Sequence, residues 1–131
     1  MPSIAFANST ATVAPVSFSV SPNPVKGSPN TYVPVTVTWT NRGTHTFVAK
    51  SCVAWFSTTS KSGPWTKGTG CFKGQPFPYT IGPGKVSEKV SQYIASHLLP
   101  GTTVYFKVIA TGTYNGAAAQ STPTYFSLIV T

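Results

Sequence analysis

The chain has 131 residues and a formal net charge of +8, from nine basic residues and a single acidic one, Glu88. This length fits one domain with a proper hydrophobic core. Only 8% of the residues are charged, against about a quarter in an average soluble protein. Hydroxyl and amide side chains must therefore cover much of the surface. One acidic side chain also excludes paired carboxylates and leaves a Ser-His-Asp triad without its acid, so we predict that the chain is not an enzyme.

The first 14 residues are predicted to be an N-terminal arm or an added edge strand. The segment IAFANSTATVAPVSFSV (4–20) alternates apolar side chains and suits strand exchange with a neighbouring molecule. The apolar positions of this candidate strand-exchange arm are Ile4, Phe6, Val13 and Val16. Ala5-Phe6-Ala7 has the form of a signal-peptidase site, yet few residues precede it, so a signal remnant and a plain arm both stay open. Asn8 begins an N-glycosylation motif, although one such motif is close to chance frequency.

Residues 15–131 consist of short β-rich runs that Pro and Gly separate about every ten residues, which is typical of a β-sandwich. In TYVPVTVTWTNRG (31–43), Val35, Val37 and Trp39 share one parity and threonines hold the other. This period of two predicts a strand with one buried face. Further strands are predicted at 16–20, 47–57, 71–72, 103–111 and 124–130. Residues 58–68 are predicted to be a polar hairpin and residues 73–85 a loop or irregular edge.

The passage VSEKVSQYIASHLL (86–99) has the spacing of a helix. Val86, Val90, Ile94 and Leu98 recur at intervals of four, which predicts a helix as the alternative to a strand.

Three motifs carry a family resemblance. They are the Val-x-Val-x-Trp pattern ending at Trp39, the segment CVAWFSTTSKSGPWTKG (52–68), and YIASHLLPGTTVYFKVIA (93–110) with its Leu-x-Pro-Gly-Thr hinge. They resemble the second strand, the third strand with its hairpin, and the sixth strand of fibronectin type III-like and immunoglobulin-like modules of microbial and viral surface proteins. The resemblance covers residues 15–131. It implies a single antiparallel β-sandwich of seven or eight strands with Greek-key connections, and it favours a strand over a helix for residues 91–96.

The hinge departs from the family at one position. The family usually has a tyrosine where Val104 stands, and Tyr105 comes one residue later. Either a local bulge restores Tyr105 to that role, or Val104 is a core residue, which we favour because Phe106 and Val108 share its parity. Lys107 then points to solvent or to a partner. Since the chain has almost no carboxylates, we expect another molecule to complement its charge.

Cys52 and Cys71 are the only cysteines. We predict a disulfide between the third strand and the return of its hairpin, worth about 3 kcal/mol in the chain-entropy model, with two free thiols as the alternative. A cysteine pair with none left over suits an oxidising exterior. His45 and His97 do not stand at metal-ligand spacing, so we predict no metal and no cofactor.

The hairpin and the loop after it contain four aromatic residues that we predict as an interaction surface: Trp65, Phe72, Phe77 and Tyr79. Exposed aromatic rings stack on sugars or anchor protein interfaces. The alternative is a hairpin folded over its own sandwich edge. Trp39 is expected in the core, whereas Trp55 lies on a strand whose outer face a neighbouring subunit could cover.

The basic residues are spread along the chain and eight of the nine are lysines, which argues against specific nucleic-acid binding and for weak attraction to polyanionic or glycan surfaces. No apolar run is long enough for a transmembrane segment.

We therefore predict a structural or adhesion module on the outside of a virion or cell, such as a capsid, decoration or filament subunit, that self-associates or docks on a larger assembly. The alternatives are a carbohydrate-binding accessory module that uses Trp65 and a spacer domain of a secreted protein. Because carboxylates are nearly missing, we also expect stability to change little between neutral pH and about pH 3.

Overall fold

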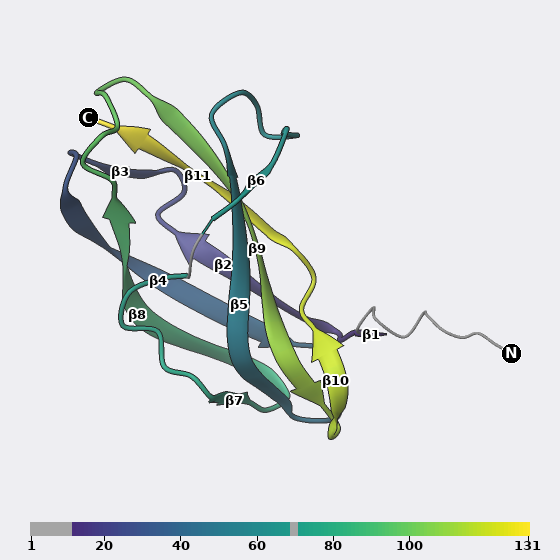
Figure 1. The fold of residues 1–131 in the computed structure, drawn as a ribbon. Helices are drawn as coiled ribbons and strands as arrows, with labels where there is room; N and C mark the ends of the chain where they lie inside the picture. Colours follow the sequence, from purple (N-terminus) through teal and green to yellow (C-terminus); the bar gives the residue numbers. More distant parts are fainter. Residues whose placement is uncertain (1–11, 69–70) are drawn as a thin grey trace, which may run out of the picture.

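The computed structural model describes residues 12–68 and 71–131, which form eleven β-strands in two sheets and no helix (Figure 1). The strands are β1 (Thr12–Val13), β2 (Val16–Ser21), β3 (Val25–Gly27), β4 (Thr31–Asn41), β5 (Phe47–Ser57), β6 (Thr66–Lys67), β7 (Tyr79–Ile81), β8 (Gly84–Ile94), β9 (Thr103–Tyr114), β10 (Ala117–Gln120) and β11 (Thr124–Val130). The prediction of an all-β fold is confirmed.

The smaller sheet has three antiparallel strands in the order β2-β4-β8. Its central strand β4 shows the predicted alternation, because Val35, Val37 and Trp39 are buried and the threonines between them are not. Strand β8 pairs with β4 along its whole length, from Thr31 opposite Ile94 to Asn41 opposite Gly84. Residues 84–94 are therefore a strand rather than a helix. A spacing of four fits the period of two as well as that of a helix turn, so it could not separate the alternatives.

The larger sheet has eight strands arranged around β9. One edge of β9 pairs with β5, and its other edge pairs first with β11 and then with β10. The short strands β6 and β7 pair with β5 on the edge away from β9. This arrangement makes β5, β9 and β11 the broad outer surface of the molecule on this side (Figure 1).

Two pairings in the larger sheet are parallel, β1 with β10 and β3 with β11. The expectation of a purely antiparallel fold with seven or eight strands is therefore wrong in detail. In the chain, β1 and β3 stand on either side of β2, which belongs to the smaller sheet. Both pair instead with strands of the larger sheet, β1 with β10 and β3 with β11. Pro22 and Pro24 lie between β2 and β3 and lack the N–H that a continued ladder would need.

The buried side chains of both sheets form one hydrophobic core. Its largest fully buried members are Trp39, Phe47, Ile81, Ile94 and Leu128. Val104 and Val108 are buried too, as predicted, while the Tyr105 hydroxyl makes none of the hydrogen bonds found among residues 12–68 and 71–131. Val104 is thus a core residue, and the tyrosine bond of the family is missing from this hinge.

Hydrogen bonds join the sheets along the side where β2 meets β11. The Thr124 hydroxyl donates to the Phe18 carbonyl at 2.7 Å, and the Thr122 N–H donates to the Val16 carbonyl at 3.0 Å. Val16, expected in a strand-exchange arm, is fully buried in β2. Val13 is exposed in β1, at the edge of the larger sheet. Ile4, Phe6 and Asn8, and the Ala5-Phe6-Ala7 segment, lie outside the described residues.

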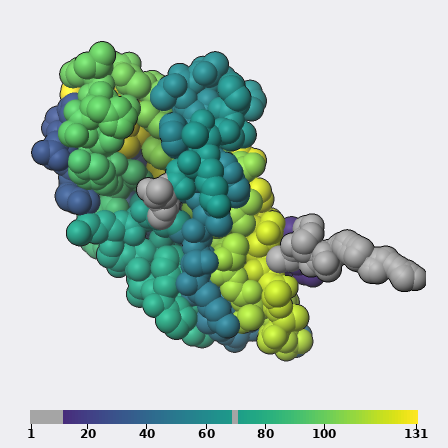
Figure 2. Space-filling view, viewed as in Figure 1, coloured from purple at the N-terminus to yellow at the C-terminus, as the bar shows by residue number. Residues whose placement is uncertain are grey.

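The hairpin between β5 and β6 and the loop between β8 and β9 stand at the same end of the molecule (Figure 1). In the space-filling view they form neighbouring teal and green lobes (Figure 2). None of the described residues forms a helix long and apolar enough to span a membrane.

Candidate functional site

A row of alternating lysine and aromatic side chains crosses the outer face of the larger sheet. Trp55 on β5 is opposite Lys67 on β6 and Lys107 on β9, and Lys107 is in turn opposite Tyr125 on β11. Lys107 and Tyr125 have the parity opposite to the buried positions of β9 and β11, so they point away from the core. On β5 the register shift between Ala49 and Ser51 reverses the two faces, so that Ala54 and Phe56 pack against the core and Trp55 between them points outward. Side chains directly opposite one another in antiparallel strands lie close enough to interact, and the row therefore forms one continuous surface.

Lys107 lies between two tryptophan rings. Its Nζ is 4.8 Å from the centroid of the Trp55 ring and 5.9 Å from that of Trp65. The Trp65 ring also lies 6.1 Å from the Tyr125 ring, at an angle of 46°. Both distances from the ammonium are within the range of a cation–π interaction. We call Trp55, Trp65, Lys107 and Tyr125 the aromatic–lysine cluster.

Lys107 points away from the core, as predicted, and the faces of Trp55 and Trp65 flank its ammonium. The rings are neutral, so the positive charge of Lys107 has no anionic partner in the cluster. The cluster remains open to solvent, because Tyr125 is 56% exposed and both tryptophans are partly exposed.

Trp65 reaches the cluster because the hairpin that carries it is held by serines. The buried Ser57 hydroxyl accepts the N–H groups of Thr59 and Ser60, at 3.2 and 3.4 Å. The Ser60 hydroxyl donates to the Gly63 carbonyl at 2.7 Å. Such side-chain bonds to nearby backbone groups fix a turn without regular structure. The polar composition of the hairpin therefore places an aromatic ring over the sheet.

A small hollow of about 190 Å³ adjoins the cluster. It is lined by Asn23, Lys61, Trp65, Tyr105, Phe106, Tyr125, Phe126 and Ser127. Asn23 is fixed in place, since its side-chain oxygen accepts the N–H of Ser127 at 3.1 Å. The hollow thus combines aromatic walls with amide, hydroxyl and ammonium groups at one place on the surface.

The structure does not bring the four aromatic residues of the predicted interaction surface together. Phe72 is buried, with its ring 5.5 Å from that of Phe126, and Phe77 and Tyr79 pack against the core. Only Trp65 belongs to the cluster. The partners of Trp65 come from strands distant in sequence, and their outward parity was the one available signal.

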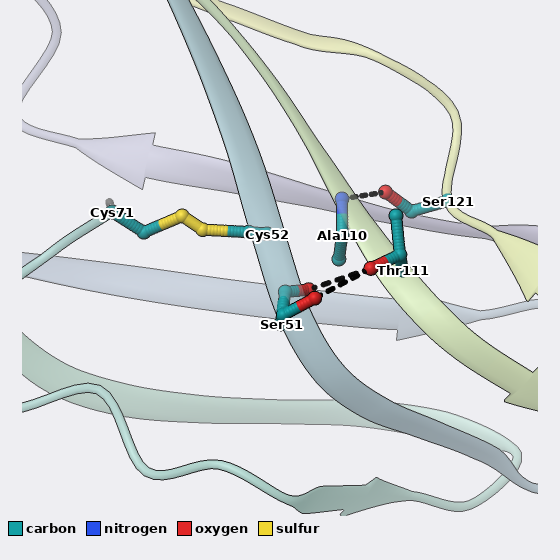
Figure 3. The surroundings of a disulfide bond; sticks show 6 residues. All are labelled: Ser51, Cys52, Cys71, Ala110, Thr111 and Ser121. Atoms are coloured by element: carbon teal, nitrogen blue, oxygen red, sulfur yellow. Dashed lines mark hydrogen bonds between the residues drawn. A yellow bond between two sulfur atoms is a disulfide. The ribbon is translucent and has the colours of Figure 1, made fainter. Parts of the chain in front are cut away.

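Cys52 and Cys71 form a disulfide with their Cα atoms 6.2 Å apart, which confirms the predicted pairing (Figure 3). Cys52 belongs to β5 of the larger sheet. Two residues after Cys71, Lys73 pairs with Ser91 of β8 through hydrogen bonds of 2.8 and 2.9 Å. The disulfide therefore connects the two sheets on the side away from the β2–β11 contact. A disulfide also suits an oxidising environment.

Two hydrogen bonds near the disulfide hold β9 to its neighbours. The Ser51 and Thr111 hydroxyls lie 2.7 Å apart, and the Ala110 N–H donates to the hydroxyl of buried Ser121 at 2.9 Å (Figure 3). The Ser121 N–H returns a bond to the Ala110 carbonyl, so this serine continues the ladder across the break between β10 and β11.

Glu88 lies on the inner side of β8, opposite Val37. Its Oε2 accepts a hydrogen bond from Trp39 Nε1 at 3.3 Å, while its Oε1 is buried without a hydrogen-bond partner in the described part of the chain. Burial raises the pKa of this carboxyl above its ordinary value, although polar contacts with Trp39, Tyr79 and Gln75 oppose the rise. Burial and the nearby Glu88 charge also raise the pKa of Tyr79.

A larger hollow of about 390 Å³ lies beside the disulfide. Its wall includes Phe56, Phe72, Phe106, Val108 and Phe126, all of which belong to the hydrophobic core or pack against it. The hollow is open on one side, where the exposed residues Lys67 and His97 line it.

The described residues offer no group of three or more His, Cys, Asp or Glu side chains that could hold a metal ion. His45 packs edge-on against Tyr114, with the ring centroids 5.7 Å apart.

No protein-family model matches the chain, and no curated protein matches it significantly. Among solved structures, the chain is similar to the alkylpurine DNA glycosylase AlkC of Pseudomonas fluorescens, bound to DNA containing an abasic site analog. The TM-score is 0.47 and the identity 14%, and the match covers 88% of this chain and 30% of that chain. A likeness this weak says nothing about what the chain does.

Proposed function

We propose that the chain is a non-enzymatic β-sandwich module of the fibronectin type III-like or immunoglobulin-like class that attaches to a larger assembly on the outside of a virion or cell. The strand order supports this class. The set β2-β4-β8 forms one sheet, the set β5-β9-β11 the other, and both contribute to one core. The chain crosses from one sheet to the other between β4 and β5, between β7 and β8, and between β8 and β9, and such crossings are typical of a Greek-key sandwich.

The aromatic–lysine cluster is the observation that carries the proposed role in attachment. It places two tryptophans and a tyrosine, the residue types that dominate binding hot spots, on the outer face of a rigid sheet. Trp55 and Lys107 are fixed by the ladder between β5 and β9, so little conformational freedom would be lost on binding. Partners of such a face are other copies of the chain, a larger surface assembly, or a glycan.

The external location is supported by two further features. The Cys52–Cys71 disulfide persists in oxidising surroundings. Most outer positions of β2 and β4 are serines and threonines, among them Ser17, Ser19, Thr36 and Thr38, which give a hydrated surface of low charge.

Attachment is tested by sedimentation velocity over a range of protein concentrations and by a glycan array, using the wild type and Trp65→Ala. We expect self-association or glycan binding in the wild type and its loss in the variant. Tyr32→Ala is the control, because Tyr32 is an exposed aromatic residue on the smaller sheet. A wild type that stays monomeric and binds no glycan would overturn the proposal, as would equal losses in both variants.

A further inference from the structure

We infer that the aromatic–lysine cluster and its hollow bind an anionic polysaccharide, one with carboxylate or sulfate groups along a sugar chain. This inference rests on the proposed function, in which the same face attaches the module to a surface. It names the chemistry of the partner.

The positive charges on this face favour an anionic ligand. Lys107 lies within the cluster, Lys67 continues its row, and Lys61 lines the hollow. The only acidic side chain of the chain, Glu88, lies on the inner side of the other sheet. Because no acidic side chain of the chain stands beside these lysines, an external polyanion is the complement that the surface lacks.

The shape of the face suits a sugar chain. A hollow of about 190 Å³ is smaller than the roughly 300–1,000 Å³ of pockets that enclose a drug-sized ligand, so it admits one unit of a longer molecule. The row from β6 to β11 crosses three strand spacings, about 14 Å. Aromatic faces pack against the apolar C–H faces of sugar rings, and Asn23, Ser127 and Lys61 bring hydrogen-bonding groups to the hollow. A polymer can therefore lie along the row with one ring in the hollow.

The same features favour a polysaccharide over a single-stranded nucleic acid. The Trp65 and Tyr125 rings are 6.1 Å apart and tilted by 46°, whereas successive bases stack on aromatic platforms set parallel to them. The cations of this face are all lysines, and the chain's single arginine, Arg42, bonds Ser17 on the smaller sheet. Arginine is the residue that grips phosphate with two hydrogen bonds.

The test measures binding of the full chain to four polymers: alginate, which carries carboxylates, heparin, which also carries sulfates, neutral dextran, and oligo-dT. We expect binding to alginate or heparin that weakens with added salt and no binding to dextran. Alginate against heparin decides which anionic group is preferred. Tyr125→Ala should weaken the binding about tenfold, the equivalent of about 1.4 kcal/mol, and Lys61→Gln several-fold. Both side chains are exposed, so both variants should fold.

Matched controls come from the other sheet. Tyr32 is 53% exposed against 56% for Tyr125, and Lys85 is an exposed lysine of β8. Tyr32→Ala and Lys85→Gln should leave binding unchanged. A loss in Lys85→Gln equal to that in Lys61→Gln would mean that only the overall charge of the chain acts. A loss in Tyr32→Ala equal to that in Tyr125→Ala would place the binding on the smaller sheet as well, where Lys73 lies over the Tyr32 ring. Either result would overturn the inference.

Three other results also decide the matter. Oligo-dT binding as tight as alginate binding, with the same loss in Tyr125→Ala, would make the face a nucleic-acid site. Dextran binding as tight as alginate binding would remove the role of charge. If neither anionic polymer binds but self-association persists and is lost in Trp65→Ala, the inference fails and the proposed function stands. If the wild type neither self-associates nor binds any glycan on the array, both fail.

Discussion

Lys107 and Trp55 are direct cross-strand neighbours, and the ammonium of one lies 4.8 Å from the ring of the other. The ladder between β5 and β9 fixes this pair, and the hairpin brings Trp65 to the same ammonium. Lysine is usually a mobile surface residue, but Lys107 is half-buried and its ammonium lies between two tryptophan rings. This cationic centre is thus part of the folded structure and also part of the proposed binding face.

Replacing this lysine tests how much the pair stabilises the fold. Lys107→Met keeps an aliphatic stem and removes the charge, so it should lower the free energy of unfolding by about 1 kcal/mol, the size of a partly exposed cation–π interaction. Urea unfolding followed by tryptophan fluorescence measures the loss. Lys89→Met is the control, since Lys89 is an exposed lysine opposite Thr36 on the smaller sheet. A loss no larger than that of the control would show that the rings and the ammonium contribute nothing to stability.

The disulfide closes the side of the molecule away from the β2–β11 contact. It joins residues 19 positions apart, and a closed loop of this length stabilises by about 3 kcal/mol in the chain-entropy model. Reduction should lower the melting temperature accordingly. Hydrogen exchange should rise first at Lys73 and Ser91, whose pairing depends on the anchored Cys71 segment. The double variant Cys52→Ala/Cys71→Ala should be insensitive to reductant. A wild type whose melting temperature is the same with and without reductant would contradict this role.

The close approach of β5 and β9 at Gly112 leaves no room for a side chain. A Cβ atom there would overlap the Val48 carbonyl, beside the irregular register between Ala49 and Ser51. Gly112→Ala should therefore destabilise the fold by about 2 kcal/mol or more, since the obstacle is backbone. At Gly82 a Cβ would meet nothing within 4 Å, so Gly82→Ala should stay within about 0.5 kcal/mol. Equal effects of the two substitutions in chemical denaturation would refute the argument.

Much of the fold follows from local pattern. The alternation of Val35, Val37 and Trp39 predicts a strand with one buried face, and the structure shows it in β4. The pairing of Cys52 with Cys71 was predictable because a bridge between a strand and the return of its hairpin was compatible with their separation. These predictions needed only the alternation of side chains along the chain and the number and separation of the cysteines.

The cluster was not predictable in the same way. Trp55, Lys107 and Tyr125 meet through the registers of β5 with β9 and of β9 with β11, and strand registers are set by the whole sheet. The grouping of Trp65 with Phe72, Phe77 and Tyr79 relied on nearness in sequence. The chain instead turns back after the hairpin, so that Phe72 enters the core and Lys73 pairs with Ser91. The parallel pairings of β1 and β3 are likewise long-range.

The single acidic side chain gives the stability a pH dependence of known sign. Because burial raises the pKa of Glu88 in the folded state, the folded chain binds a proton more tightly than the unfolded chain does. The resulting stabilisation is fully present below the unfolded pKa and is lost as the pH rises through the folded pKa. Acidification from neutral pH should therefore stabilise the protein slightly, which sharpens the expectation of little change.

Glu88→Gln isolates this effect, because the variant keeps the shape of the side chain and cannot ionise. At neutral pH it should be more stable than the wild type, since it avoids the buried charge beside Trp39. As the pH falls below the folded pKa of Glu88, the stability difference between the two proteins should shrink, and His45 and His97, which both proteins share, cancel in the comparison. Urea unfolding of both proteins at several pH values measures the difference. A wild type that loses stability relative to Glu88→Gln on acidification would show that Glu88 is stabilised as a carboxylate, and the sign derived from its burial would be wrong.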